Sequence, residues 1–336
     1  MTTETLPPGF ELLRLRQVTV RGVDAWFSMQ PGEQALVAAG EAVVLGAPLA
    51  ERRRDLRTEV AGGPGGTEAQ PGTWWAGRPA RRGASGRIGQ GELLFRSGGR
   101  WRVAAGELGE PLTAPFGGTV GDVAPGAGLS LRMEAQALVG ADALGGPSAG
   151  KLHVLAARDG HVRTSEIDVG GAGAILVVGS TIDAEAITRA RAVGVRGMIV
   201  AGLGVKERRE VMASERRARS GVHDLPPFAI LVLEGAMGRP IATPVMAVLT
   251  ALKGQMTAIL PEPACLVFDD DRIAAPAQPP GLVRVTAGPL AGLEGRWAGL
   301  AGLHRFAGGV VLEAGLIRLG GREPLPVPLG DLERFA

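Results

Sequence analysis

The sequence predicts a β-rich protein of three domains: a β domain over residues 1–150, a small α/β domain over residues 151–270 and a β-barrel over residues 281–336. The length of 336 residues suits two or three domains at roughly 100–200 residues each. Glycine (53 residues) and proline (24 residues) are both frequent, which favours short strands joined by many turns. From residue 151 the short strand-like runs give way to longer apolar runs that alternate with helical patterns.

Short strand-like runs fill most of residues 1–150, and turns containing Gly or Pro separate them, which predicts a β-sandwich or β-barrel. The pattern is interrupted over residues 61–90, where Gly, Pro and Arg are frequent, and we expect a loose loop insertion there. Trp74 and Trp75 lie inside this insertion. We expect them to fold back onto the nearest domain; a contact patch for a partner is the alternative.

Two segments of the first domain, residues 34–50 and residues 112–126, carry apolar runs with matching turns. The second contains Ala-Pro-Phe-Gly-Gly-Thr-Val at residues 114–120, followed by Pro-Gly. Together they resemble the two halves of a barrel-sandwich hybrid, the fold of biotinyl and lipoyl carrier domains. In that family a lysine on an exposed hairpin carries the prosthetic group. The matching turn region here, residues 131–135, has no lysine, and neither has any other part of residues 1–150, so we expect the fold without the carrier function.

An alternation of apolar strands and helices predicts a parallel, helix-covered sheet in the second domain. A helix is expected to begin at a capping box formed by Ser180 and Asp183 and to end near Ala192. The expected strands are residues 174–179, 197–201, 228–233 and 256–260, and the other expected helices are residues 205–219 and 244–253. Residues 190–200 resemble the helix–strand step of swivelling β/β/α domains.

The junction between the first of these strands and its helix is a weak candidate for an anion site. Gly179, Ser180 and Thr181 lie where free backbone amides at a helix N-terminus can bind phosphate. The sequence contains neither Gly-x-Gly-x-x-Gly nor Gly-Lys-Ser/Thr, so an ordinary helix cap is the alternative.

Other reactive groups give no recognisable pattern. The four histidines (His153, His161, His223 and His304) do not stand at metal-ligand spacing. Asp269, Asp270 and Asp271 are expected to form a solvated strand end, because consecutive side chains of an extended chain point in alternating directions. Cys265 is expected to be a small buried hydrophobe. We therefore expect no metal and no cofactor, and we favour a protein that is not an enzyme.

The C-terminal residues carry the most specific resemblance. A Pro-rich segment, residues 274–280, is expected to be a spacer before the last domain. Short strands are predicted at residues 282–285, 309–312, 316–319 and 326–329. Residues 283–295, Val-Arg-Val-Thr-Ala-Gly-Pro-Leu-Ala-Gly-Leu-Glu-Gly, resemble a KOW motif, and residues 321–333 resemble the end of the C-terminal barrel of the NusG transcription-factor family.

That resemblance implies an SH3-like barrel that binds a protein or RNA partner in transcription or translation. The residues proposed to contact the partner are Arg284, Arg296, Trp297, His304, Arg305 and Phe306. For Trp297 and Phe306 the alternative is a place in the barrel core. Clustered arginines at positions 284, 296, 305 and 318 would favour RNA, whereas scattered arginines would favour a protein.

The sequence is consistent with three functions. The first is a cytoplasmic adaptor that docks on the transcription or translation machinery through the last domain. The second is a structural or assembly subunit of a larger complex. The third is an enzyme with a ligand site between the first two domains, near residues 179–181. A formal net charge of +2 decides nothing about nucleic acid, and the N-terminus has neither the basic nor the apolar part of a signal peptide.

Overall fold

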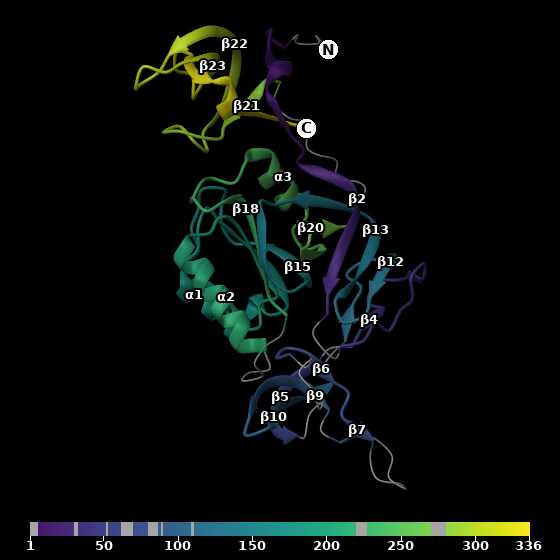
Figure 1. The fold of residues 1–336 in the computed structure, drawn as a ribbon. Coiled ribbons are helices and arrows are strands. Elements are labelled where there is room, and N and C mark those ends of the chain that lie inside the picture. The colour runs from purple at the N-terminus through teal and green to yellow at the C-terminus, as the bar shows by residue number, and fades with distance from the viewer. Residues whose placement is uncertain are drawn as a thin grey trace. The chain divides into compact units, whose positions relative to one another are not determined.

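The computed structural model describes residues 6–29, 33–51, 53–61, 70–79, 87–88, 90–108, 111–219, 227–269 and 280–336. The chain divides into two compact units. The first unit contains Met1–Arg21, Gln136–Arg208 and Phe228–Ala336, and the second contains Gly22–Ala135 and Arg209–Pro227. Strands predominate over helices, so the expectation of a β-rich protein with several sheets is confirmed (Figure 1). Among the described residues, no helix is both long enough and apolar enough to cross a membrane.

The second unit is built of short antiparallel strands. One part contains β3 (Ala42–Val43), β4 (Pro48–Ala50), β11 (Leu112–Thr113) and β12 (Gly118–Ala124). Here β3 pairs with β12, β4 pairs with β11, and β12 pairs with β13 (Gly128–Val139). The strands β13 and β2 (Thr19–Ser28) each contain residues of both units.

A separate four-stranded sheet lies within the predicted insertion and next to it, in the order β5-β10-β9-β6. Its strands are β5 (Arg53–Ala61), β6 (Trp74–Trp75), β9 (Gly91–Ser97) and β10 (Arg100–Leu108), and β7 (Arg78–Pro79) pairs with β8 (Arg87–Ile88) nearby in sequence. Trp75 packs against the buried residues Leu93, Trp101 and Val103. The expectation that this tryptophan folds back onto its own domain is therefore confirmed.

Residues 131–135 do not form the exposed hairpin that the carrier-domain resemblance implies. They lie inside β13, and Met133 is fully buried there. The strand is continuous because Arg132 and Glu134 alternate with buried residues, which keeps the two-residue period of a half-buried strand.

The α/β part of the first unit contains a parallel sheet, as predicted. Residues 148–154 were not predicted as one of its strands, and the predicted strand at residues 256–260 is antiparallel to both of its neighbours. Four neighbouring parallel strands are β15 (Ser148–Val154), β16 (Ala174–Gly179), β17 (Gly197–Gly202) and β18 (Ala229–Gly235). Antiparallel strands extend the sheet on both sides: β14 (Asp142–Gly145) pairs with β18, and β19 (Met256–Pro261) pairs with β15 and with β20 (Ala264–Phe268). The central strands are buried on both faces, which explains their continuous apolar sequences.

Helices α1 (Ala184–Ala192), α2 (Val205–Arg219) and α3 (Thr243–Ala251) agree closely with the sequence prediction. Val245, Val248 and Leu249 of α3 join the largest hydrophobic core together with residues of the parallel strands. Short 3-10 turns form at Phe10–Leu12 (η1), Thr164–Glu166 (η2), Val169–Gly171 (η3) and Leu329–Asp331 (η4).

The C-terminal sheet has six strands in the order β1-β25-β21-β22-β23-β24. They are β1 (Arg14–Arg16), β21 (Leu282–Val285), β22 (Glu294–Arg305), β23 (Val311–Arg318), β24 (Leu325–Pro328) and β25 (Leu332–Phe335). The strand β1 comes from the N-terminal end of the chain and pairs in parallel with β25, the last strand. Leu13 lies in the core of this sheet with Val283 and Trp297. The N-terminal segment is thus a part of the C-terminal sheet, whereas the sequence analysis placed it in the first domain.

Two strands of this sheet differ from the sequence prediction. The long strand β22 was not predicted; in the structure Gly299 and Gly302 lie inside it with positive φ angles, at shifts of its register with β23. The predicted strands at residues 309–312 and 316–319 form one strand, β23, whose centre at Ala314 and Gly315 is buried. The spacer predicted at residues 274–280 lies almost entirely outside the described residues.

Candidate protein-binding site

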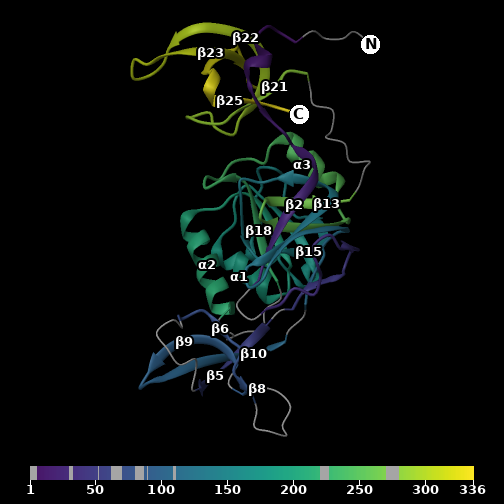
Figure 2. The same cartoon turned by 45° about the vertical axis from the view of Figure 1, so that its right-hand side comes forward.

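The most unusual surface of the first unit is the far end of the β22–β23 hairpin, residues 300–313, which we call the ribbon. Every residue from Leu300 to Arg305 in β22 is exposed, and so is every residue from Val311 to Glu313 in β23. Figures 1 and 2 both show these two strands and their turn extending away from the rest of the C-terminal sheet. An antiparallel hairpin without other cover gains little stability by itself.

The ribbon carries large apolar side chains on both of its faces. In the antiparallel register Leu303 lies opposite Glu313, and His304 lies opposite Leu312. Directly opposed residues share a face and successive residues alternate, so Leu303 and Leu312 lie on different faces. The exposed large apolar residues of this region are Leu300, Leu303, Val310, Val311 and Leu312. Since solvated strands normally expose polar residues on at least one face, this composition makes the ribbon a candidate surface for a partner.

Two aromatic side chains of the ribbon contact each other. The rings of His304 and Phe306 meet edge to face with their centroids 4.9 Å apart. His304 is exposed and Phe306 is half-buried. Phe306 is therefore not in the core of the C-terminal sheet, and both rings are accessible from the surface.

The edges of the C-terminal sheet, by contrast, are poorly suited to pairing with another chain. The edge strand β24 contains Pro326 and Pro328, which have no N–H to donate. The opposite edge, β1, is three residues long and carries Arg14 and Arg16. Short, charged or proline-containing edges resist strand addition, so the faces of the ribbon are the better candidate surface.

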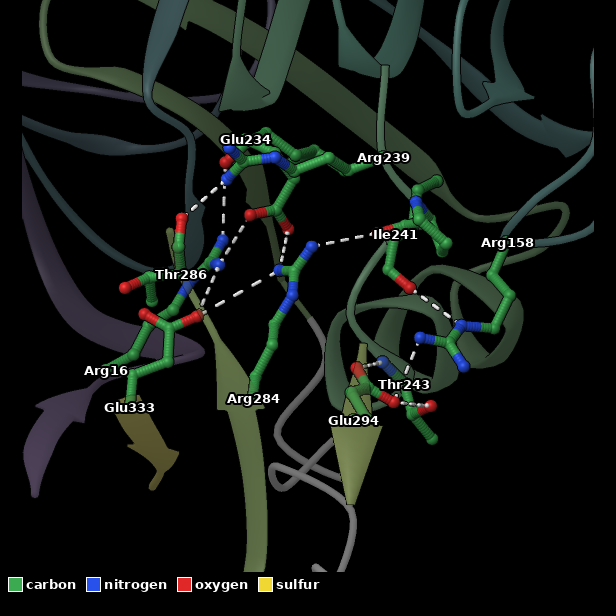
Figure 3. A network of polar contacts seen from close by, with 12 residues as sticks. Arg16, Arg158, Glu234, Arg239, Ile241, Thr243, Arg284, Thr286, Glu294 and Glu333 are labelled. Atoms are coloured by element: carbon green, nitrogen blue, oxygen red, sulfur yellow. Dashed lines mark hydrogen bonds and ion pairs between the residues drawn. The ribbon is translucent and has the colours of Figure 1, made fainter. Parts of the chain in front are cut away.

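A cluster of buried charges joins the C-terminal sheet to the α/β part of the same unit (Figure 3). Arg284 of β21 lies 2.7 Å from Glu234 Oε1 at the end of β18, and its side chain is 2% exposed. Arg16 of β1 donates to Glu234 Oε2 at 2.8 Å and lies 3.4 Å from Glu333 Oε1 of β25. The two guanidinium groups and two carboxylates balance, as buried charges require. Burial alone would lower the pKa of Arg16, but the carboxylates of Glu234 and Glu333 raise it above its usual value.

A second polar contact fixes the start of the ribbon strand β22. The carboxylate of Glu294 accepts hydrogen bonds from the backbone N–H and the hydroxyl of Thr243 at the beginning of α3. Arg158 pairs with the same carboxylate at 2.9 Å and donates to the carbonyl of Ile241. The helix N-terminus, whose N-cap Ala242 has no side-chain cap, is thus capped by a residue 51 positions later in the chain.

The structure separates the residues that the sequence analysis proposed as partner contacts. Arg284 is buried in the charge cluster, and Trp297 belongs to the core of the C-terminal sheet. Arg296 is exposed opposite Arg318, and Arg305 lies at the far end of the same strand, opposite Val311. His304, Arg305 and Phe306 are the proposed contacts that lie on or next to the ribbon. The exposed leucines and valines of the ribbon were not among the proposed contacts.

At the predicted anion site, both hydrogen-bond donors of Ser180 are used within the protein. The amide and the hydroxyl of Ser180 both donate to the carbonyl of Gly160, at 2.8 Å and 2.9 Å. His161 contacts the carbonyl and the hydroxyl of Thr181. The N-cap of α1 is Asp183, which accepts from the amide of Ala186, so Ser180 does not form the expected capping box.

The same close packing favours glycine at position 179, because a β-carbon there would lie 2.3 Å from the carbonyl oxygen of Gly160. Within the described part of the chain, no three His, Cys, Asp or Glu side chains are grouped so as to hold a metal ion. Of the Asp triplet only Asp269 lies within the described residues, and His223 lies outside them.

In the comparison with known proteins, no protein-family model, no curated protein and no solved structure matches this chain.

Proposed function

We propose that this protein is a non-enzymatic adaptor that binds a protein partner of the transcription or translation machinery in the cytoplasm. The observation that carries the proposal is the ribbon, which exposes apolar side chains on both faces. The C-terminal part is proposed to be a KOW-type, SH3-like barrel, with the ribbon as its binding element. Its five antiparallel strands, β25, β21, β22, β23 and β24, with β1 added in parallel to β25, support that proposal.

The two other parts of the chain are proposed to be folds without chemistry of their own. The strands β3, β4, β11 and β12 with β13 suit a barrel-sandwich hybrid that lacks a modified lysine. The parallel strands β15 to β18 with their helices suit a swivelling-type α/β domain.

Scattered arginines favour a protein over RNA as the partner. Arg284 is buried and paired, so it is withdrawn from any surface. Arg296 and Arg318 are neighbours, but Arg305 lies at the opposite end of β22 and next to Val311. Binding to RNA depends on several basic side chains that reach phosphates together. The ribbon itself offers large apolar groups, which suit the buried centre of a protein–protein interface.

The test is affinity capture from the native lysate with the double variant Leu303→Ser and Leu312→Ser, which removes one large apolar group from each face. Val169→Ser is the matched control, because Val169 is 78% exposed and Leu303 is 76% exposed. We expect wild type and control to capture the same ribosomal or RNA polymerase proteins. The double variant should lose at least nine-tenths of them, a tenfold effect that corresponds to about 1.4 kcal/mol.

Nuclease treatment separates the two kinds of partner. Capture that survives nuclease supports a protein contact, whereas loss after nuclease would mean that RNA is the partner. If the wild type, the control and the double variant all capture the same proteins, the ribbon is not the binding site.

A structural or assembly subunit is the second candidate. The buried charge cluster favours it, because Arg16, Glu234, Arg284 and Glu333 hold the C-terminal sheet to the α/β part as one body rather than as a tethered module. Recovery of further copies of this chain alone in the same experiment would favour this candidate.

A further inference from the structure

The C-terminal sheet has a second contact surface, at Trp297, which the first described residues of the chain occupy. The indole Nε1 of Trp297 donates a hydrogen bond to the carbonyl oxygen of Pro8 at 3.2 Å. Leu6 lies over Gly281: a β-carbon on this glycine would be 3.7 Å from Leu6 Cδ2 and 3.8 Å from Trp297 Cβ. Figures 1 and 2 both show the N-terminal segment running beside β21 and β22.

The rest of the N-terminal segment is held much more firmly than residues 6–8. Leu13 is buried in the core of the sheet, and the strand β1 that follows is hydrogen-bonded to β25. Phe10 packs against this core under the guanidinium of Arg334, whose Cζ lies 5.6 Å from the ring centroid. Gly9, with φ near +87°, makes a turn between the two parts, and a β-carbon there would collide with Leu300.

Residues 6–8, by contrast, form a lightly held end. Leu6 is 46% exposed and Pro8 is exposed. The bond from Trp297 to Pro8 is the one hydrogen bond described for these three residues. Residues 6–8 can therefore leave the surface while Leu13 and β1 stay in place.

The chemistry of this contact is that of proline-rich peptide recognition. Two successive prolines favour the extended polyproline conformation, in which carbonyl oxygens point outward and are free to accept hydrogen bonds. Aromatic surfaces on small β domains bind such segments at low entropic cost. Trp297 is only 4% exposed with residues 6–8 in place, and the carbonyl oxygen of Pro8 satisfies its N–H.

We propose that Trp297 and Gly281 form a docking site for a proline-containing segment of a partner protein, and that Leu6-Pro7-Pro8 occupies this site in cis. The external ligand is a segment of the same chemistry: a large apolar residue followed by proline. The tethered segment acts as a competitor, because a short tether gives an effective concentration on the order of millimolar. This site is distinct from the ribbon, and it does not depend on the function proposed above.

The probe is a fluorescein-labelled peptide with the sequence of residues 4–10, measured by fluorescence anisotropy against the full chain. Wild type is compared with the triple variant Leu6→Ser, Pro7→Ser and Pro8→Ser, which weakens the competitor and leaves Gly9 to Leu13 unchanged. We expect the triple variant to bind the peptide at least tenfold more tightly than wild type. A peptide with both prolines replaced by serine is the control and should bind at least tenfold more weakly.

Two further measurements keep the proposal open to refutation. Trp297→Phe in the triple variant removes the N–H donor and should weaken peptide binding at least tenfold. In the triple variant with Trp297 intact, the indole N–H resonance should move from its wild-type position and return toward it when the peptide is added. Equal affinity of wild type and triple variant, no binding below about 1 mM peptide, or an indole resonance that the peptide does not change would overturn the proposal.

Discussion

Replacing Arg284 with methionine tests whether the buried charges hold the C-terminal sheet in place. The change keeps most of the side-chain volume but removes one positive charge from a site that is 2% exposed. Glu234 then keeps Arg16 as its partner at 2.8 Å, and Glu333 has the same guanidinium at 3.4 Å. Two buried carboxylates would share one counter-charge. Removing one partner from a buried ion pair costs about 3–5 kcal/mol, which is the loss of unfolding free energy that we expect.

The double variant Arg284→Met and Glu234→Gln separates charge balance from simple loss of contacts. This double variant leaves Arg16 and Glu333 as a balanced ion pair. Its loss of unfolding free energy should therefore be smaller, by about 1–3 kcal/mol, than the sum of the losses in the single variants Arg284→Met and Glu234→Gln. Arg296→Met is the control, because Arg296 is exposed on the neighbouring strand β22, and it should change stability by less than about 0.5 kcal/mol.

The measurement is urea denaturation of the full chain, followed by tryptophan fluorescence and by circular dichroism. Two results would refute the idea that these four charges act as a unit. One is a double variant whose loss of unfolding free energy equals the sum of the two single losses, and the other is an Arg284 variant as stable as the Arg296 control.

Two further predictions concern buried positions. Burial raises the pKa of the Cys265 thiol from 9.0 to about 12, so the folded chain should resist thiol reagents at pH 8 and react when unfolded. A raised folded-state pKa keeps the thiol's stabilising contribution intact below pH 9, and raising the pH from 9 toward 12 should reduce stability in wild type more than in Cys265→Ala. At Gly315 a β-carbon would lie 2.1 Å from the ring of Trp297, so Gly315→Ala should cost about 1–3 kcal/mol in thermal unfolding. Gly330→Ala, where no atom lies within 4 Å, is the control and should unfold close to the wild-type temperature.

The α/β part was the most predictable region, for a physical reason. Its strands are buried on both faces and therefore carry continuous apolar sequences, such as residues 174–179 and 197–202. The strands β16, β17 and β18 are each followed by a helix, and local signals mark helix boundaries, such as Asp183 at the start of α1 and Gly194 after its end. These signals act over a few residues, so a single sequence is enough to locate them.

The C-terminal sheet was less predictable, because its pairing is not local. In the pairing of β1 with β25, Arg14 lies opposite Glu333, which is nearly the whole chain away in sequence, and no short motif predicts this pairing. Arg284 shows the same limit: alternation along β21 is clear, yet it does not say whether the arginine faces solvent or a carboxylate of Glu234 brought from β18. Arginine in an exposed position and arginine in a buried ion pair look identical in sequence.

These long-range contacts also change how the C-terminal part should be studied. A chain ending at Asp271 would lack Arg284 and Glu333 and would leave Glu234 with Arg16 alone. It would also remove Val283 and Trp297 from around Leu13, exposing a residue that is now in the core. Loss of a partner by such a truncation would therefore mix the loss of a binding surface with damage to the α/β part. Point substitutions at Leu303 and Leu312 avoid this, because both side chains are exposed and can be changed without removing core contacts.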